Sequence, residues 1–337
     1  MKVVIIIAVL LVLFAVFSPL VVLNMKEEPR FIEEEQEEQE SVDTEIEKHE
    51  ILQNTGCNVN VLMGDETVTM DIEEYLVGVV AGEMPVSFEV EALRAQAVAA
   101  RTYTLHKLWV EPSANHDADV CTDPACCKAY ADEESLRESW GGDFEINHAK
   151  IVAAVWETQG TYMVYDDEPV LAVFHSSSSG ATENSGNVWN RDIPYLVSVT
   201  SPEDADEVKD YISTTEISYG EFKEIFLQKY PDAQFSDDTD TWITDIVYSE
   251  SGRINSAVVG GVAVRGTEIR GLYGLRSTAV SVAMGAKGVV FTATGYGHGV
   301  GMSQYGANCM AQEGKTWQEI LKWYYSGIEF SSLLYTI

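Results

Sequence analysis

The sequence contains few basic residues. Among its 337 residues, Lys and Arg together number 21 and Asp and Glu 54, so the formal net charge at pH 7 is −33. Proteins that bind nucleic acid or anionic lipid through charge need a basic surface. The composition therefore argues against nucleic acid as a partner and favours a neutral or locally recognised substrate.

The sequence also lacks internal repeats and the usual signatures of nucleotide binding and of a serine nucleophile. The glycine-rich stretch GYGHGVGMSQYGA (295–307) has neither a G-x-x-x-x-G-K-[ST] pattern nor a strand followed by G-x-G-x-x-G. His175 and Ser176 are adjacent, but no G-x-S-x-G motif accompanies them. Neighbouring residues of a strand also point to opposite faces. We therefore interpret His175 and Ser176 as residues of a polar rim or loop rather than as a nucleophile and its base.

One long hydrophobic run is present near the start of the chain. Residues 3–23 form an uncharged, almost wholly apolar segment of 21 residues, which at about 1.5 Å per residue can cross the hydrocarbon core of a bilayer. A cleaved signal peptide is typically shorter and ends in a small-x-small site, of which Phe17-Ser18-Pro19 is a poor version. We predict a single-pass transmembrane anchor over 1–24, with the rest of the chain outside the cytoplasm.

Residues 25–50 are strongly acidic, with 12 acidic and three basic side chains. Such a segment cannot bury enough apolar surface to offset its ordering entropy. It is predicted to be a disordered linker that holds the ectodomain, residues 51–337, away from the membrane.

Beyond the linker, helical patterns come first and strand patterns follow. Asp71 resembles a helix N-cap ahead of apolar residues at helical spacing. These patterns predict an α+β fold, in which a helical N-terminal part and a strand-rich remainder form a cleft. The predicted elements are helices over 72–80, 89–109, 143–158, 219–228 and 317–324, strands over 57–63 and 66–70, and hairpins with turns at 166–169 and 251–252.

Glu83 is expected on the short connection between the first two helices. Gly82 is a typical helix stop, and Pro85 disfavours a helical backbone at the residue before it. A tight turn between two helices would hold the carboxylate rigidly. Most glycosidases use two carboxylates, but one suffices when the substrate supplies the attacking hydroxyl, since the same acid then serves twice. From the local pattern alone, a surface carboxylate is the more ordinary interpretation.

Several ordered motifs resemble those of the SpoIID family (stage II sporulation protein D) and of the related amidase enhancers. They are GEMP with EALRAQAVAARTYTL, then GATENSGNVW, PYLVSV and GYGHGVGMSQYGA, and the resemblance spans roughly residues 59–324. It implies a lytic transglycosylase that cleaves peptidoglycan between N-acetylmuramic acid and N-acetylglucosamine. The muramic C6 hydroxyl attacks within the substrate and leaves a 1,6-anhydro end. Glu83 matches the acid/base of this reaction.

The resemblance also suggests substrate-binding residues. Gln96 and Arg101 fall on functional helix positions, although helix packing and an ion pair are the alternatives for them. Val197 stands where many relatives carry lysine, which removes one expected substrate contact. His298 lies in the glycine-rich stretch, which either approaches a glycan or forms a tight turn around a hydrogen-bonded histidine. The complete predicted set is Gln96, Arg101, Tyr103, His175, Ser176, Thr182, Tyr195 and His298.

Four soft or borderline ligands lie within 12 residues, at His116, Cys121, Cys126 and Cys127. They suit tetrahedral Zn²⁺, and four protein ligands would make a closed, structural site. A disulfide is the alternative, with Cys57 and Cys309 as remote partners. Some relatives resemble this chain in having zinc at this place, and we favour structural zinc that the chemistry itself does not require.

The resemblance further implies partners and a setting. The expected substrate is a peptidoglycan glycan strand stripped of its stem peptides. The expected partners are the cell-wall amidase SpoIIP and the membrane protein SpoIIM, during engulfment of the forespore from the mother-cell membrane. A non-catalytic module that activates such an amidase is the alternative function, and a zinc-dependent hydrolase is a third.

Overall fold

The computed structural model describes residues 57–114, 116–189 and 191–333. The predicted anchor over 1–24 and the predicted linker over 25–50 lie outside the described residues. Within the described part, no helix is both long and apolar enough to span a bilayer. Helices precede most of the sheets along the chain, so the predicted α+β class is confirmed.

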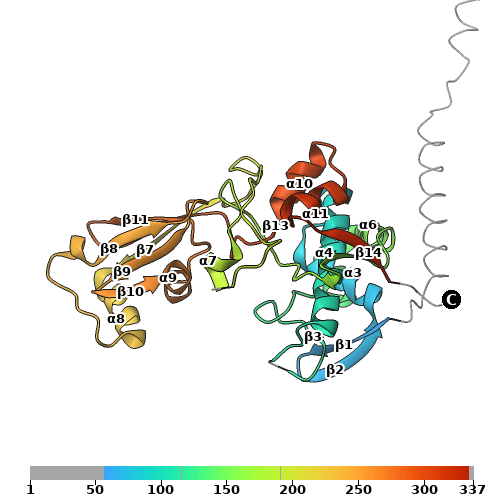
Figure 1. Cartoon of the computed structure of the whole chain (residues 1–337), viewed down its shortest axis with the longest axis horizontal. Helices are drawn as coiled ribbons and strands as arrows, with labels where there is room; N and C mark the ends of the chain where they lie inside the picture. Colours follow the sequence, from blue (N-terminus) through green and yellow to red (C-terminus); the bar gives the residue numbers. More distant parts are fainter. Residues whose placement is uncertain (1–56, 115, 190, 334–337) are drawn as a thin grey trace, which may run out of the picture. The chain divides into compact units, whose positions relative to one another are not determined.

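A hairpin leads into the first helix, as the sequence predicted (Figure 1). β1 (Asn58–Met63) and β2 (Glu66–Asp71) pair antiparallel, and Gly64 makes the turn with a φ of 61°. The carboxylate of Asp71 accepts a hydrogen bond from a backbone N–H in the first turn of α3 (Ile72–Glu83). This N-cap satisfies a donor that the helix itself cannot use.

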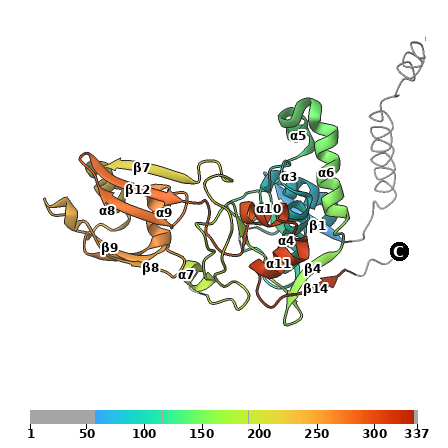
Figure 2. The ribbon, with the colours of Figure 1, turned by 90° about the horizontal axis from the view of Figure 1, so that it is seen from above.

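The alanine-rich helix α4 (Val90–Trp109) is the centre of the first hydrophobic core (Figure 2). Most of its residues are buried, which is typical of a helix covered on all sides. It packs against α3, α6 (Phe144–Trp156), α10 (Gln304–Gln312) and α11 (Trp317–Tyr324). The first and last parts of the described chain therefore meet at α4.

Short strands and helices surround this core. A hairpin turn is present within the predicted range 166–169 but is shorter than predicted. Asp166 and Asp167 make the turn with positive φ, whereas Glu168 and Pro169 already pair with the preceding strand. The chain after them is not a continuous strand. Only two residues of that segment form β6, which pairs in parallel with β13. The elements are β3 (Val120–Cys121), α5 (Glu133–Trp140), β4 (Thr161–Tyr165), β5 (Glu168–Pro169), β6 (Phe174–His175), α7 (Ser185–Trp189), β13 (Met302–Ser303) and β14 (Glu329–Ser332).

A second hydrophobic core lies within residues 212–294. Two three-stranded antiparallel sheets, in the orders β11-β12-β7 and β10-β9-β8, form it together with two helices. Phe222 is its central aromatic residue and stacks on Tyr273 with ring centroids 4.6 Å apart. The elements are β7 (Ile212–Ser218), α8 (Tyr219–Lys229), β8 (Ile243–Tyr248), β9 (Ile254–Val259), β10 (Val262–Arg265), α9 (Gly266–Tyr273), β11 (Val280–Met284) and β12 (Gly288–Thr294).

The buried carboxylate of Glu183 joins the loop before α7 to the turn between β8 and β9. Glu183 follows Thr182 in the GATENSGNVW motif and is 2% exposed. Its Oε2 accepts hydrogen bonds from the hydroxyls of Ser249 (2.5 Å) and Ser251 (2.7 Å). A buried carboxylate needs such donors to offset its desolvation, so these bonds fix the path of the loop.

Candidate active site

Glu83 is the last residue of α3 rather than part of the connection after it. The sequence predicted that the helix stops at Gly82, but α3 continues through Gly82 to Glu83. A Cβ atom at Gly82 would lie only 3.1 Å from the backbone nitrogens of Tyr130 and Ala131, so glycine permits this segment to come close. The N–H of Ala129 then donates a 2.9 Å hydrogen bond to Oε1 of the half-buried Glu83. A backbone donor thus fixes one carboxylate oxygen.

A buried lysine, Lys128, lies beside Glu83. It is 7% exposed, and its Nζ lies 4.1 Å from the ring centroid of Tyr103 and 3.8 Å from that of Phe174. Burial lowers the pKa of Lys128 to about 8, and the carboxylate of Glu83 partly offsets this effect. Glu83 is the only carboxylate among the described residues that acts on Lys128 in this way.

Sequence reasoning missed Lys128. The available signal was its position, directly after the predicted ligand Cys127 in a chain with few lysines. Its neighbours Tyr103 and Phe174 belong to α4 and β6. These elements are distant from Lys128 in the sequence, so the residues around Lys128 do not predict the contacts.

His298 lies close enough to Lys128 for the lysine charge to act on it. Desolvation and the nearby cation Lys128 lower the pKa of His298, and its ring is 5.3 Å from that of Trp189 and 5.6 Å from that of His175. The N–H of Val300 donates a 3.0 Å hydrogen bond to Nδ1 of His298. His298 is therefore a hydrogen-bonded residue of the glycine-rich turn, and its contact with a glycan stays a prediction.

The glycines of this turn approach the backbone closely. Gly297 has a φ of 114°, and a Cβ there would lie 2.7 Å from that of His175. Gly301 has a φ of 70°, and a Cβ there would lie 2.1 Å from the carbonyl oxygen of Val173. Both positions need glycine for backbone conformation and for space.

The four predicted metal ligands converge. Their ligand atoms lie within 4.8 Å of one another, with 3.9 Å between the sulfurs of Cys126 and Cys127. A disulfide between these sulfurs would need about 2.05 Å. Nδ1 of His116 lies 2.8 Å from the carbonyl oxygen of Ala118, and its Nε2 lies 3.7 Å from the sulfur of Cys127. A hydrogen bond from Nδ1 to a backbone carbonyl orients metal-binding histidines in this way, so the donor set fits a metal ion.

The alternative disulfide partners lie elsewhere. Cys57 is close to Asp71 and Glu73, and the charges of Glu203, Asp204 and Glu207 act on Cys309. The grouping of His116, Cys121, Cys126 and Cys127 includes neither cysteine.

The comparisons with known proteins identify the family of this chain. A sequence model of the SpoIID family, described as a stage II sporulation protein, matches residues 64–165. Stage II sporulation protein D of Bacillus amyloliquefaciens is 40% identical over 262 residues, which cover 77% of this chain and 74% of that protein. The corresponding protein of Bacillus subtilis is 39% identical over 263 residues, with the same coverage of 77% and 74%. The chain belongs to the SpoIID family.

A more distant relative carries a different name. The amidase enhancer of Bacillus subtilis is 27% identical to this SpoIID-family chain over 304 residues, which cover 76% of the chain and 40% of that protein. The two kinds of relative together support a general role in sporulation and cell-wall processing.

Arg101 of this SpoIID-family chain is fully buried and is not beside Glu83. Its guanidinium forms an ion pair with the equally buried Glu73 and donates to the carbonyl oxygens of Val155 (3.1 Å) and Thr161 (3.0 Å). These bonds occupy the donors that a glycan would need. Substrate binding by Arg101 stays a prediction.

Four more of the predicted residues hold loops and strands together. The ring of Tyr103 packs under Lys128, and burial raises the pKa of its hydroxyl. Oγ1 of Thr182 accepts from the N–H of Val199 at 2.9 Å, and the hydroxyl of Tyr195 accepts from the N–H of Leu171 at 2.8 Å. The carbonyl oxygen of Ser176 accepts from the N–H of Tyr305 at 3.0 Å. The substrate roles of these four residues stay predictions.

His175 is buried among protein partners. Its Nδ1 lies 3.2 Å from the carbonyl oxygen of Val300 and its Nε2 lies 2.7 Å from the hydroxyl of Ser178. Desolvation lowers the pKa of His175 well below its usual range, so the ring is neutral at pH 7. Its contact with a sugar also stays a prediction.

Gln96 is fully buried, and neither atom of its amide has a hydrogen-bond partner among the described residues. An unpaired buried amide destabilises a protein by about 1–3 kcal/mol. We expect Gln96→Met to raise the free energy of unfolding by about 1 kcal/mol, measured by urea denaturation. Turnover by the same variant shows whether the amide also serves the substrate.

Thr102→Val is the matched control for Gln96→Met. The hydroxyl of Thr102 accepts a 3.0 Å hydrogen bond from the N–H of Met163, so its removal leaves a buried donor unpaired and should lower stability. If Gln96→Met destabilised the protein as much as Thr102→Val does, the amide of Gln96 would have to be well paired.

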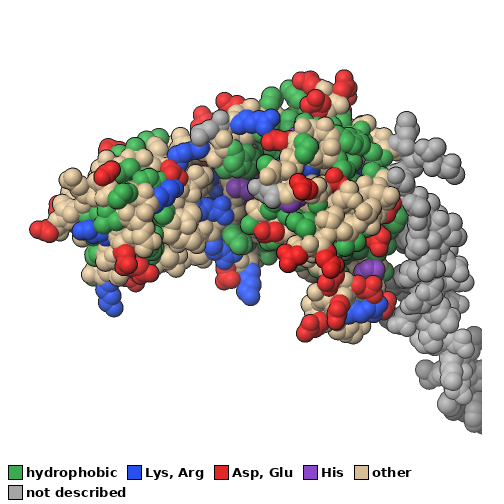
Figure 3. Space-filling view, turned by 90° about the horizontal axis from the view of Figure 1, so that it is seen from below, with side chains coloured by type: hydrophobic (Ala, Val, Ile, Leu, Met, Phe, Trp, Pro, Cys, Tyr) green, Lys and Arg blue, Asp and Glu red, His purple; other side chains and the backbone are tan. Residues whose placement is uncertain are grey.

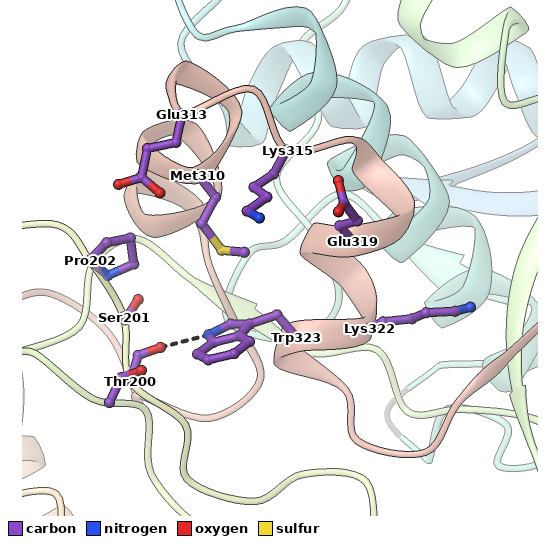
Figure 4. Close-up of a pocket in the computed structure, with 9 residues that line it drawn as sticks. All are labelled: Thr200, Ser201, Pro202, Met310, Glu313, Lys315, Glu319, Lys322 and Trp323. Carbon is purple, nitrogen blue, oxygen red and sulfur yellow. Dashed lines mark hydrogen bonds between the residues drawn. The ribbon is translucent and has the colours of Figure 1, made fainter.

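A groove lies between α10, α11 and the segment 200–202 (Figure 4). It has a volume of about 540 Å³, and the indole N–H of Trp323 donates to the carbonyl oxygen of Thr200 at 2.7 Å. None of the predicted site residues lines it. The lining residues are Thr200, Ser201, Pro202, Met310, Glu313, Lys315, Glu319, Lys322 and Trp323.

Proposed function

We propose that the chain is a lytic transglycosylase that cleaves the bond between N-acetylmuramic acid and N-acetylglucosamine in peptide-free glycan strands. The observation that carries the proposal is the setting of Glu83. One rigidly held carboxylate lies beside a buried cation, and no second carboxylate of the described residues acts on that cation. Such a site suits a reaction that needs a single acid/base.

In the proposed reaction Glu83 acts twice. As a carboxylic acid it gives its proton to the bridging oxygen, the bond from that oxygen to C1 of the muramic sugar breaks, and an oxocarbenium-like state forms. The Glu83 carboxylate then takes the proton of the muramic C6 hydroxyl while the O6–C1 bond forms. The products are a 1,6-anhydro end and a free hydroxyl on the leaving sugar, and Glu83 is again protonated. Water is not consumed.

The side chains around Glu83 support this cycle. The ammonium group of Lys128 is positioned to stabilise the carboxylate that exists between the two proton transfers, because charges act strongly in a dry site. The Ala129 N–H keeps the carboxylate oriented. The neutral rings of Tyr103 and Phe174 confine the ammonium group.

To test the proposal, the purified chain is incubated with peptide-free glycan strands and the products are analysed by mass spectrometry. We expect strands that end in anhydro-muramic acid. Reducing-end muramic acid instead would mean hydrolysis, and intact strands would favour the second candidate function.

That second candidate is a non-catalytic module that activates a cell-wall amidase. The likeness to the amidase enhancer favours it. Enhanced release of stem peptides by an added amidase, without anhydro ends, would support it.

The proposal includes structural zinc at His116, Cys121, Cys126 and Cys127. Thiolates and imidazole suit this ion, and four protein ligands leave no position for a reacting water. Zinc would fix the loop that continues directly into Lys128 and Ala129. It would take no part in the bond-breaking step.

Loss of the metal should therefore weaken catalysis indirectly. We expect Cys126→Ser to lose bound zinc in elemental analysis, to unfold at a lower temperature, and to lose about tenfold or more in activity. Cys57→Ser, which changes a cysteine outside the cluster, is the control and should keep its zinc. Unchanged zinc in the Cys126→Ser protein would remove Cys126 from the ligand set.

The proposed location and partners are those predicted from the sequence. The chain would be anchored once in the mother-cell membrane with its catalytic part outside the cytoplasm. There it would act during engulfment together with SpoIIP and SpoIIM. Co-purification of these proteins from sporulating cells is the direct test.

A further inference from the structure

A second pocket, lined by cations, lies at the C-terminal end of α9. It has a volume of about 350 Å³, within the range of about 300–1,000 Å³ that is typical of small-molecule sites. Two of its lining residues, Arg270 and Arg276, are basic, and none is acidic. The lining residues are Thr267, Arg270, Gly271, Gly274, Leu275, Arg276 and Tyr296.

These two arginines have no carboxylate partner. Across the described ranges, neither forms an ion pair, although acidic residues outnumber basic ones in this chain by 54 to 21. Desolvation lowers the pKa of Arg270, and no carboxylate of the described residues opposes this effect. A half-buried guanidinium without a counter-charge is unfavourable in the free protein and is suited to an incoming anion.

Both side chains are held in place. Nε of Arg270 donates to the carbonyl oxygen of Leu275 at 3.2 Å, which leaves its two terminal nitrogens uncommitted. The guanidinium of Arg276 lies 4.6 Å from the ring centroid of Tyr296, which is 46% exposed. A stacked arginine and an open aromatic face are both common in sugar and carboxylate recognition.

The pocket adjoins the glycine-rich turn of the active site. The N–H of Gly297 donates to the carbonyl oxygen of Arg276 at 2.9 Å, and the charge of Arg270 contributes to the lowered pKa of His298. Figure 3 shows Lys and Arg side chains close to histidine side chains in the middle of this face. The turn that carries His298 therefore borders the pocket, and His298 lies close enough to Arg270 and Lys128 to be affected by the charge of both.

We propose that Arg270 and Arg276 form a subsite that binds a carboxylate carried by the glycan strand itself. This inference rests on the proposed function. Each muramic sugar has a lactyl group whose carboxylate is free only when no stem peptide is attached, since the peptide is joined there by an amide bond. A planar guanidinium binds a carboxylate through two parallel hydrogen bonds, and the face of Tyr296 would lie against the sugar ring.

The test measures binding separately from catalysis. The full chain with Glu83→Gln is titrated with peptide-free strands and with the same strands after their carboxylates have been converted to methylamides. We expect the free carboxylates to bind about tenfold more tightly. Arg270→Gln with Arg276→Gln should abolish this preference and leave the affinity for the methylamide strands unchanged.

Matched variants complete the test. Lys315→Gln with Lys322→Gln removes two positive charges from the groove on α10 and α11 and should keep the tenfold preference. The single variant Arg270→Gln loses one described hydrogen bond, so it should fold even if the double variant does not, and it should lose part of the preference. An unchanged preference in the folded arginine variants would overturn the subsite.

The two proposals can fail independently. If the wild-type chain makes anhydro ends but binds both kinds of strand equally, the subsite is wrong and the transglycosylase stands. If binding depends on the carboxylate and the arginines but no anhydro ends form, the subsite stands and the catalytic proposal is wrong.

Discussion

Glu83→Gln should lower the rate of anhydro-end formation by roughly 10²–10⁴-fold, the usual contribution of a general acid/base. The amide cannot protonate the bridging oxygen or accept the C6 hydroxyl proton. Its carbonyl oxygen can still accept the hydrogen bond from Ala129 that the carboxylate accepts at 2.9 Å. The fold and the affinity for glycan strands should therefore change little.

The measurement is the initial rate with peptide-free strands, followed by mass spectrometry, with thermal unfolding of each protein alongside. Glu89→Gln is the matched control. Glu89 precedes α4, is exposed, and makes no side-chain capping hydrogen bond, so its variant should retain full activity. Equal rates for Glu83→Gln and wild type would remove Glu83 as the acid/base.

Glu73→Gln should produce the largest loss of stability, about 3–5 kcal/mol. The variant leaves the charge of Arg101 in a fully buried position without its counter-charge. It also weakens the bond that Glu73 accepts from the N–H of Gly160 at 3.0 Å. Chemical denaturation monitored by far-UV circular dichroism gives the free energy of unfolding.

A double variant separates the structural role of Arg101 from a substrate role. Glu73→Gln with Arg101→Met removes both charges and should recover much of the lost stability, because replacing a whole buried pair is far less destabilising than breaking it. We expect the folded double variant to keep its affinity for glycan strands. Recovered stability with lost affinity would show that Arg101 contacts the substrate.

Elements with a strong local pattern were predictable. Helix α11 has the predicted bounds of 317–324, and α8 differs from its prediction by one residue. The turn at Ser251-Gly252 joins β8 and β9 as expected, since alternation and turn residues are local signals. In contrast, α5, β11 and β12 were not predicted.

The parts of the site that depend on distant contacts could not be read from the sequence. Arg101 pairs with a residue 28 positions earlier in the chain, and no spacing rule gives that partner. Lys128 becomes part of the site only because its loop folds back onto Gly82. The convergence of the metal ligands was predictable, because all four lie in one short segment.

In the loop at residues 126–129, successive residues have different roles. Cys126 and Cys127 belong to the metal-ligand group, Lys128 is the buried cation, and Ala129 gives its N–H to Glu83. Surface loops normally tolerate insertions and deletions. Here one added or missing residue would move every later group out of place, so the length of this loop is as constrained as that of a helix in the core.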